Sequence, residues 1–338
     1  MKERQYLFSN LKAFLIFTVV FGHMVQLLPE STARSFLMLW IYSFHMPAFI
    51  FVSGYFSKNV QKSYEKAYEN YFLPFLFMTV VYVILRLIIV QEFAFRLIMP
   101  VFAAWYILVV FYYKRLLRYL SKIPAGILFP ITIGISLISG LIPMIGDEYA
   151  LGRTISFLPF FLAGFYLKKE QLEAWKKRIS IPAAIGALII ISVGFLYYVF
   201  HYSFVYNPML NSLRYTRYGF SWWQGMLFKL YFTAMAFLMI AVFLILFQEK
   251  KRIYSYIGDH TMSVYALHCI VFLSIRQFGL FNKYSWVQGV GMAFLVAVTT
   301  VFVLSVPKVC DCYMAGCRWM TRMEKRYVMG IKPQNKIS

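Results

Sequence analysis

Long apolar runs alternate with short polar or basic segments along this chain, and the pattern predicts helices that cross a membrane. A helix rises about 1.5 Å per residue, so about 20 apolar residues span the hydrocarbon core of a bilayer. The ten predicted spans are 8–28, 36–57, 71–90, 97–114, 125–145, 154–167, 180–200, 226–247, 260–278 and 286–307. The sixth is short for a full crossing, which predicts a tilted or broken helix.

The first run, FSNLKAFLIFTVVFGHMVQLL (Phe8–Leu28), carries two ionisable residues, Lys12 and His23. Eleven residues make about three helical turns, so both side chains lie on one face, about 16 Å apart along the axis. An ionisable group inside a membrane helix costs about 2.5–3.5 kcal/mol by insertion scales, so its presence indicates a function. We therefore expect the rest of the chain to be organised around this helix.

Composition agrees with a membrane protein, because 61% of the 338 residues are hydrophobic, 14% are charged, and the mean hydropathy is +0.65. A soluble domain is nearer half apolar and a quarter charged. The predicted fold is an all-α polytopic membrane protein with about ten transmembrane helices, located in the cytoplasmic membrane. Residues 1–310 are expected to form one integral-membrane domain, and residues 311–338 a basic cytosolic tail.

The net charge of +21 is explained by the sides on which the loops lie. With the N-terminus inside, 24 of the 34 lysines and arginines fall in segments predicted to be cytosolic, and seven fall in outer loops. Short cytosolic loops carry such an excess of basic residues. We therefore expect both termini in the cytosol and no nucleic-acid partner.

Three histidines within predicted spans are candidate site residues: His23, His45 and His268. A neutral imidazole can act as a base near neutral pH, and the alternative for each is a packing or interhelical hydrogen bond. His23 and His45 lie on neighbouring antiparallel spans at nearly the same depth, which predicts a shared site. Pro47 is expected to kink the second span and to free a carbonyl near His45. Ser53 and Gly54 further along are expected to allow close helix packing.

Arginine and aromatic side chains in the outer halves of the spans could complete such a site. Arg86 and Arg153 are candidates for holding an anion or a developing oxyanion. The alternatives are snorkelling to the headgroups for Arg86 and an ion pair with the nearby acidic residues for Arg153. Trp105 could line a pocket, or it could belong to the core or to an interfacial aromatic belt. The aromatic loop 201–224 is either part of such a belt or a lid over a sugar site.

Basic residues at the predicted cytosolic face could meet phosphate groups. A stripe of basic residues recurs every four positions and would lie along one side of a helix: Lys58, Lys62 and Lys66. The alternative explanation is the ordinary excess of basic residues at the cytosolic face. The four cysteines are expected to be reduced thiols, and we expect no metal site, because too few ligands share one depth. The chain has no P-loop, GxGxxG, HExxH or GxSxG motif, which argues against ATP-driven transport and a self-contained hydrolase.

The ordered motifs resemble those of acyltransferase family 3, the membrane-bound O-acyltransferases. Within that family the chain is most similar to the fucose 4-O-acetylase-like sugar acetyltransferases. The matching segments, spread from Leu7 to about Val271, are LKAFLIFTVVFGH, SFHMPAFIFVSGYFSK, YFLPF, WYILVVF, GRTISFLPFFLAGFYL and YIGDHTMSVYALHCIV. The chain departs from the family pattern at Ser9, where relatives often carry an acidic residue, and in its looser lysine stripe before the third span.

The resemblance implies an acyl-CoA donor on the cytosolic side and a sugar hydroxyl as acceptor. It matches His23 to the essential histidine of the family, Lys12 to its basic partner, Arg153 to a recurrent arginine, and His45 to the histidine of the FHMP motif. Lys12, Lys62 and Lys66 would then meet the phosphates of acetyl-CoA. The soluble C-terminal domain of some members is missing here, so the membrane part would transfer the group alone or with a partner.

The resulting prediction is an O-acetyltransferase that acts on a surface or lipid-linked glycan such as a capsule or exopolysaccharide. His23 would either deprotonate the acceptor hydroxyl or carry the acyl group itself. The expected partners are the glycan or lipid-linked sugar, membrane lipids and glycan-assembly proteins. The alternative function is a membrane exporter or flippase of a glycan or glycolipid, and a non-enzymatic scaffold ranks last.

Overall fold

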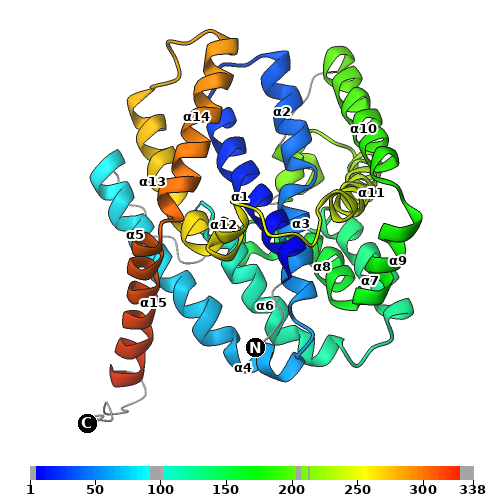
Figure 1. The fold of residues 1–338 in the computed structure, drawn as a ribbon, viewed down its shortest axis with the longest axis horizontal. Helices are drawn as coiled ribbons and strands as arrows, with labels where there is room; N and C mark the ends of the chain where they lie inside the picture. Colours follow the sequence, from blue (N-terminus) through cyan, green and yellow to red (C-terminus); the bar gives the residue numbers. More distant parts are fainter. Residues whose placement is uncertain (1–4, 92–99, 101, 203–206, 212–213, 328–338) are drawn as a thin grey trace.

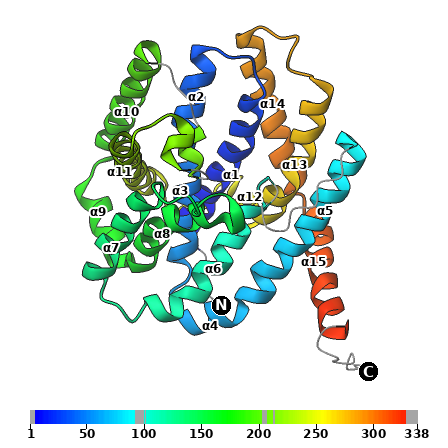
Figure 2. The same ribbon diagram turned by 180° about the vertical axis from the view of Figure 1, so that it is seen from behind.

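The computed structural model describes residues 5–91, 100, 102–202, 207–211 and 214–327, and within these ranges the chain is helical without any β-strand (Figures 1 and 2). The long helices are α1 (Tyr6–Gln26), α5 (Leu73–Val90), α6 (Ala104–Leu120), α7 (Ala125–Ser139), α8 (Leu151–Tyr166), α10 (Ile181–His201), α11 (Trp222–Leu246), α13 (Thr261–Phe278), α14 (Trp286–Leu304) and α15 (Pro307–Tyr327). The shorter ones are α2 (Thr32–Tyr42), α3 (His45–Tyr55), α4 (Val60–Ala67), α9 (Lys169–Arg178) and α12 (Ser255–Asp259). The prediction of an all-α fold is confirmed.

Short helical turns of other types connect some of these helices. They are a π-helical turn, Tyr68–Phe72, between α4 and α5, and three 3₁₀ turns, Glu148–Ala150, Asn207–Leu210 and Tyr215–Tyr218. Because the π-helical turn continues α4 directly into α5, the predicted third span is the later part of a longer rod.

Seven helical segments of the described residues are long and apolar enough to cross a membrane, or eight if the bent pair of α8 and α9 counts as one span. The predicted sixth span, 154–167, is a continuous helix within α8 up to Tyr166, and the 89° bend to α9 follows its end, between Tyr166 and Lys169. Helix α6 has 17 residues and α7 has 15, so both fall short of a full crossing by length. The structure supports a multi-pass membrane protein, and ten spans stays a prediction.

Helix α1 lies in the middle of the bundle (Figure 1) and packs against α2, α3, α12, α13 and α14. Its polar residues Ser9, Asn10 and Thr18 are buried and hydrogen-bonded. The Asn10 side chain donates to the Lys250 carbonyl at 2.9 Å and accepts from the Ser255 hydroxyl at 2.6 Å. Gly258 of α12 approaches so closely that a Cβ there would lie 1.8 Å from the Ser9 carbonyl oxygen. These contacts fix the depth of α1, and with it the depth of Lys12 and His23.

The predicted second span is broken into α2 and α3 at Ser43 and Phe44, where Phe44 leaves the helical conformation (φ −135°, ψ −28°). Proline has no N–H, and its ring clashes with the carbonyl four residues earlier, so Pro47 disrupts the helix at Ser43. The Ser43 hydroxyl instead donates to the Trp40 carbonyl at 2.7 Å. The break confirms the expected effect of Pro47, and it turns the first residue of α3, His45, inward.

The crossing of α3 and α8 depends on two glycines, Gly54 and Gly164. A Cβ on Gly54 would lie 1.9 Å from the Phe161 carbonyl oxygen, and a Cβ on Gly164 would lie 1.9 Å from that of Phe51. The two backbones therefore touch, as small residues allow in membrane bundles. The packing role expected for Gly54 is confirmed, whereas the neighbouring Ser53 hydroxyl forms a 2.8 Å hydrogen bond with Tyr106.

We expect Gly54→Ala to lower the free energy of unfolding by about 1–3 kcal/mol, since the helices must separate to admit the methyl group. The check is thermal unfolding of the purified protein in detergent. Gly186→Ala on α10 is the matched control, because a Cβ at Gly186 meets nothing within 4 Å. That control should be neutral or stabilising, as alanine favours a helix by up to about 1 kcal/mol over glycine. Equal midpoints for Gly54→Ala and the wild type would contradict this account of the crossing.

The predicted tail begins as an ordered helix, α15, which packs against α5 (Figures 1 and 2). Tyr313 and Cys317 are buried, and the Tyr313 ring lies 6.4 Å from the ring of Phe77 on α5. In both views α15 extends to the same end of the bundle as α4, so the two basic segments predicted on one side share one end. Residues 328–338 of the predicted tail lie outside the described residues.

Candidate active site

A cavity of about 170 Å³ lies at the His23 end of α1. Its polar wall residues come from six helices, α1, α2, α3, α6, α8 and α13. The lining residues are Val19, His23, Gln26, Tyr42, His45, Met46, Phe102, Ala103, Trp105, Arg153, Phe157, Met209, Leu210 and Tyr265. The expected meeting of His23 and His45 therefore occurs in one small, mostly apolar space. We call it the histidine cavity.

His23 presents the ring nitrogen Nε2 as a free base. Its other nitrogen, Nδ1, lies 3.3 Å from the side-chain oxygen of Gln26, one turn further along α1. With that oxygen as the acceptor, Nδ1 carries the proton and Nε2 keeps the lone pair. Gln26 was not anticipated from the sequence, although its position three residues after His23 on a helix would place it there.

His45 is held in the same tautomer by the break before α3. Its Nδ1 donates to the Ile41 carbonyl at 2.6 Å, one that the broken helix leaves available. The ring packs edge-on against Tyr42, with the centroids 4.8 Å apart. His45 is buried at 5% exposure, so it has little freedom to turn. It is oriented by the backbone, whereas His23 is oriented by a side chain.

His268 of α13 stacks on His23 from behind, with ring centroids 5.2 Å apart and an angle of 26° between planes. Its Nδ1 donates to the Tyr265 carbonyl at 2.7 Å, and its buried Nε2 has no hydrogen-bond partner among the described residues. The Phe102 ring packs against the His23 ring, with their centroids 4.8 Å apart, and the Phe102 backbone is in the left-handed region at φ 50°. His268 therefore supports the His23 ring and does not line the cavity itself.

Arg153 and Trp105 form the opposite wall of the histidine cavity. The Arg153 guanidinium pairs with Asp147 at 3.1 Å and donates from Nε to the Leu210 carbonyl at 3.2 Å. It also lies over the Trp105 ring, 4.9 Å from the centroid. Two explanations were considered for Arg153, an ion pair with a nearby acidic residue and a position in the site. Arg153 forms the ion pair with Asp147, and it also lines the histidine cavity. The guanidinium is held rigidly, as an oxyanion donor requires.

Arg86, the remaining arginine candidate, lies on α5 outside the wall of the histidine cavity. Helix α5 leans away from α1 toward α15 (Figures 1 and 2). Arg86 is not among the residues that line the histidine cavity with His23. Tyr265 does line the cavity and was not singled out from the sequence, although it lies within the YIGDHTMSVYALHCIV segment.

A much larger cavity, about 940 Å³, opens around the Lys12 end of α1. Six ammonium groups share its wall. They belong to Lys12, Lys58, Lys62, Lys66, Lys114 and Lys169. The three lysines expected to meet phosphates, Lys12, Lys62 and Lys66, are therefore together here, although Lys66 also pairs with Glu69 at 3.4 Å. We call this the lysine vestibule.

Lys114 and Asp259 also line the vestibule, and neither was singled out from the sequence. Lys114 is buried at 7% exposure, and its ammonium group donates to the Ser57 hydroxyl at 2.7 Å. Asp259 accepts from the Ser9 hydroxyl at 2.7 Å and lies 3.9 Å from the Lys12 ammonium group. Relatives often carry an acidic residue at the position of Ser9. In this chain a carboxylate beside Ser9 comes instead from Asp259 of α12, 250 residues later in the sequence.

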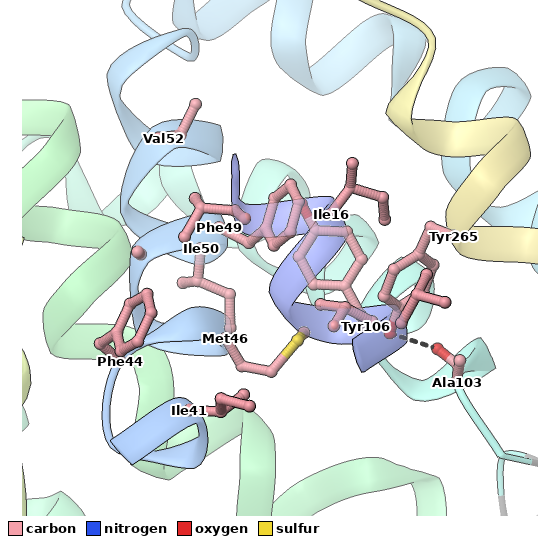
Figure 3. Close-up of a cluster of buried hydrophobic side chains, with 14 of the residues drawn as sticks. Ile16, Ile41, Phe44, Met46, Phe49, Ile50, Val52, Ala103, Tyr106 and Tyr265 are labelled. Carbon is pink, nitrogen blue, oxygen red and sulfur yellow. Dashed lines mark hydrogen bonds between the residues drawn. The ribbon is translucent and has the colours of Figure 1, made fainter. Parts of the chain in front are cut away.

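A third cavity, about 280 Å³, lies between the vestibule and the histidine cavity and has wall residues in common with each. It shares Lys12 and Lys114 with the vestibule and Tyr265 with the histidine cavity. Figure 3 shows Tyr106 and Tyr265 facing each other at this junction, their ring centroids 5.0 Å apart. The Tyr265 hydroxyl donates to the Ala103 carbonyl at 2.7 Å, drawn as a dashed line. We call the three cavities together the Lys12–His23 passage.

Among the described residues, no group of three or more histidine, cysteine, aspartate or glutamate side chains is arranged to hold a metal ion. The two ends of the passage differ in chemistry. The Lys12 end is wide and cationic, and the His23 end is smaller, mostly apolar and lined by two imidazoles, His23 and His45, whose hydrogen bonds among the described residues are at Nδ1. Such an arrangement can hold a polyanion at one end and move a proton at the other.

The family model of an acyltransferase domain (acyltransferase family 3) matches residues 6–307. The chain belongs to acyltransferase family 3. The match covers α1 through α14 and therefore both ends of the Lys12–His23 passage. No curated protein and no solved structure gives a significant match to the chain. Membership supports acyltransferase activity in a multi-pass membrane protein.

Proposed function

We propose that this family 3 acyltransferase moves an acetyl group from cytosolic acetyl-CoA to a hydroxyl of a surface or lipid-linked glycan, as in the fucose 4-O-acetylase-like branch. The observation that carries the proposal is the row of three neighbouring cavities, which begins at a vestibule walled by six lysines and ends at the cavity lined by His23. The protein would act in the cytoplasmic membrane, with the lysine vestibule facing the cytosol.

The lysine vestibule supports binding of the phosphates of acetyl-CoA. Hydrogen bonds from ammonium groups to phosphate oxygens are charge-assisted, and they are about twice as strong as neutral ones. Lys12, Lys62 and Lys66 are the expected contacts, and Lys58, Lys114 and Lys169 add charge around them. The acyl end of the donor would then enter the middle cavity, between Tyr106 and Tyr265, and reach the histidine cavity.

The histidine cavity supports the transfer step. His23 Nε2 would take the proton from the acceptor hydroxyl as its oxygen attacks the thioester carbon, and Arg153 would stabilise the oxyanion that forms. The carbon–sulfur bond then breaks, and the CoA thiolate takes the proton back from His23. His45 would orient the acceptor through its own free Nε2.

A covalent route uses the same atoms in a different order. His23 Nε2 would attack the thioester carbon and release CoA, and the acetyl-imidazole would then pass the group to the acceptor. In this route the acceptor could arrive after CoA has left. Trapping of acetylated His23 after rapid mixing with acetyl-CoA alone, read by mass spectrometry of the His23 peptide, would select the covalent route.

Proton NMR of the producer's glycan, with and without the gene, tests the proposed function. We expect O-acetyl methyl signals in glycan from the parent strain and their loss from glycan of the deletion strain, which is still made and exported. Restoration by the wild-type gene completes the test. Absence of the glycan from the cell surface, with its acetylation unchanged, would instead favour an exporter or flippase.

Donor binding should weaken as the pH rises through about 8. Burial lowers the pKa of the Lys58 ammonium group to about 8, so this charge is present below that pH and lost above it. We expect the KM for acetyl-CoA to rise up to about fivefold between pH 7 and pH 9, the range of one partly exposed charge pair. Lys58→Met should flatten this rise of KM with pH. Lys62→Met should raise KM at every pH and leave its rise with pH unchanged. A KM that is level from pH 7 to pH 9 in the wild type would contradict the vestibule's role.

A further inference from the structure

A second buried site, which the proposed reaction does not use, surrounds Lys229 of α11. The Lys229 side chain is 8% exposed, and its ammonium group donates to the hydroxyls of Ser156 at 2.7 Å and Ser139 at 3.0 Å. These serines come from α8 and α7 and are themselves buried. The Tyr215 ring lies 6.0 Å away and completes the surroundings of the charge.

The burial of Lys229 is incompletely compensated by the protein. Across residues 5–91, 100, 102–202, 207–211 and 214–327, no carboxylate forms an ion pair with it, so only two neutral hydroxyls receive its three N–H bonds. Buried charges in proteins are normally paired, because transfer of an unpaired ion out of water is costly. An ionisable residue inside a membrane bundle marks a site by default.

The space beside Lys229 is about 50 Å³. One water requires about 10–15 Å³ of such space, so the cavity has room for a small oxyacid group and not for a sugar ring. Its wall shares Tyr42, Phe157 and Met209 with the histidine cavity. A molecule with its charged group at Lys229 would therefore lie against the wall that the Lys229 cavity shares with the histidine cavity.

The Lys229 cavity also adjoins an open hollow of about 710 Å³ at the far end from the lysine vestibule, since Ile145 lines both. Arg214 and Arg217 lie in that hollow opposite Asp147 and Glu148, so its charges are mixed. Lys229 is the uncompensated cation behind this mouth. An anion entering from the side opposite the donor would meet it before it meets His23.

The backbone around this mouth is strained at three non-glycine residues. Tyr149, Ala150 and Asn211 have positive φ angles of 51°, 55° and 51°. Asn211 lines the Lys229 cavity, and its carbonyl oxygen would lie 2.8 Å from a Cβ on Gly152. Left-handed conformations of such residues cost about 1–3 kcal/mol each and cluster at ligand sites. The strain marks this wall as shaped for a ligand.

We propose that the Lys229 cavity binds an anionic oxyacid group of the acceptor, a carboxylate or a phosphate, and so selects charged glycans over neutral ones. This inference rests on the proposed acceptor side of the reaction. The Lys229 ammonium group and the hydroxyls of Ser139 and Ser156 would contact the oxyacid oxygens, and the sugar hydroxyl to be acetylated would lie in the histidine cavity. Lys229 is a binding residue in this proposal and takes no part in proton transfer.

The test is binding of small probes to the full-length protein in nanodiscs of zwitterionic lipid, measured by saturation-transfer NMR. Free CoA is added at saturation to occupy the lysine vestibule, and no acyl donor is present. The probes are phenyl β-D-glucuronide, phenyl phosphate and the neutral phenyl β-D-glucoside. We expect wild-type protein to bind at least one anionic probe about 10- to 100-fold more tightly than the neutral one. The stronger of the two anionic probes identifies the group as a carboxylate or a phosphate.

Two variants locate the effect. Lys229→Gln keeps a donor for Ser139 and Ser156 but removes the charge, and it should abolish the preference for the anionic probe. Lys283→Met, in the exposed turn between α13 and α14, removes a lysine elsewhere and should leave the preference intact.

Equal binding of charged and neutral probes by the wild type would overturn the inference even if Lys229→Gln does not fold. A preference that survives in folded Lys229→Gln would overturn it as well. Because no donor is present, these outcomes are independent of the proposed transfer. Loss of acetyl transfer with an intact anion preference would refute only the proposed function.

Discussion

Replacement of His23 by alanine is expected to lower kcat/KM for acetyl transfer by about 10²- to 10⁴-fold, the range in which a positioned general base acts. The reason is that His23 Nε2 is the free base at the end of the Lys12–His23 passage, with Nδ1 held by Gln26. The measurement is release of free CoA thiol by the purified protein in nanodiscs, with acetyl-CoA and the producer's deacetylated glycan as substrates.

His201→Ala is the matched control for this experiment, because His201 is exposed at the end of α10 and lies outside the passage. It should transfer acetyl groups at the wild-type rate. Gln26→Ala should lose less activity than His23→Ala, since it frees the ring without removing the base. Wild-type turnover by folded His23→Ala would remove His23 from the chemistry and leave the passage without a base.

Lys12→Met should raise the KM for acetyl-CoA by about 10- to 100-fold, the range of about 1.5–3 kcal/mol for a hydrogen bond to a charged group. Lys12 lines both the vestibule and the middle cavity, so in the proposed reaction the donor would pass this cation on its way to His23. The effect includes repulsion from Asp259, whose carboxylate Lys12 meets at 3.9 Å. Initial rates at varied acetyl-CoA give KM and kcat separately.

Two further variants separate the parts of that effect. Lys12→Met combined with Asp259→Asn should recover part of the lost affinity, because the repelling carboxylate is gone. Lys251→Met removes an exposed lysine between α11 and α12, outside the vestibule, and should change KM little. A KM for Lys12→Met equal to that of Lys251→Met would place donor binding elsewhere.

The part of the site that depends on depth could be predicted from the sequence. Helix rise converts residue number into depth, so the spacing of Lys12 and His23 and the level of His45 followed from counting. The break before His45 could also be anticipated, since Pro47 disrupts any helix in the same way. The structure places His23 and His45 in one cavity wall, where that argument expected them.

Which residues point toward the same cavity could not be predicted. The depth of a residue in the membrane does not say which neighbouring helix its side chain faces. Arg86 has a suitable depth, but α5 leans away from α1. His268 was a site candidate and instead supports the His23 ring. Asp259 meets Lys12 only because Gly258 lets α12 touch α1, a contact between segments about 250 residues apart.

The number of membrane spans was also only partly predictable from the sequence. Hydropathy and the distribution of charge predicted ten, and the structure contains seven segments, or eight with the bent pair, that meet the length and composition of a span. Helices α6 and α7 are shorter than a full membrane span. Helix α6 begins after a turn at Ala103, and α7 ends at a turn at Gly140, neither of which is evident from the apolar composition. Apolar residues in this bundle cover other helices as well as lipid.

A protein that is hollow from one end toward the other risks letting protons and ions leak through the membrane. Tyr106 and Tyr265 meet in the wall of the middle cavity, and their hydroxyls are bonded to Ser53 and to the Ala103 carbonyl. Both rings are therefore held in place between the lysine vestibule and the histidine cavity, where a membrane protein with cavities toward both ends needs a barrier.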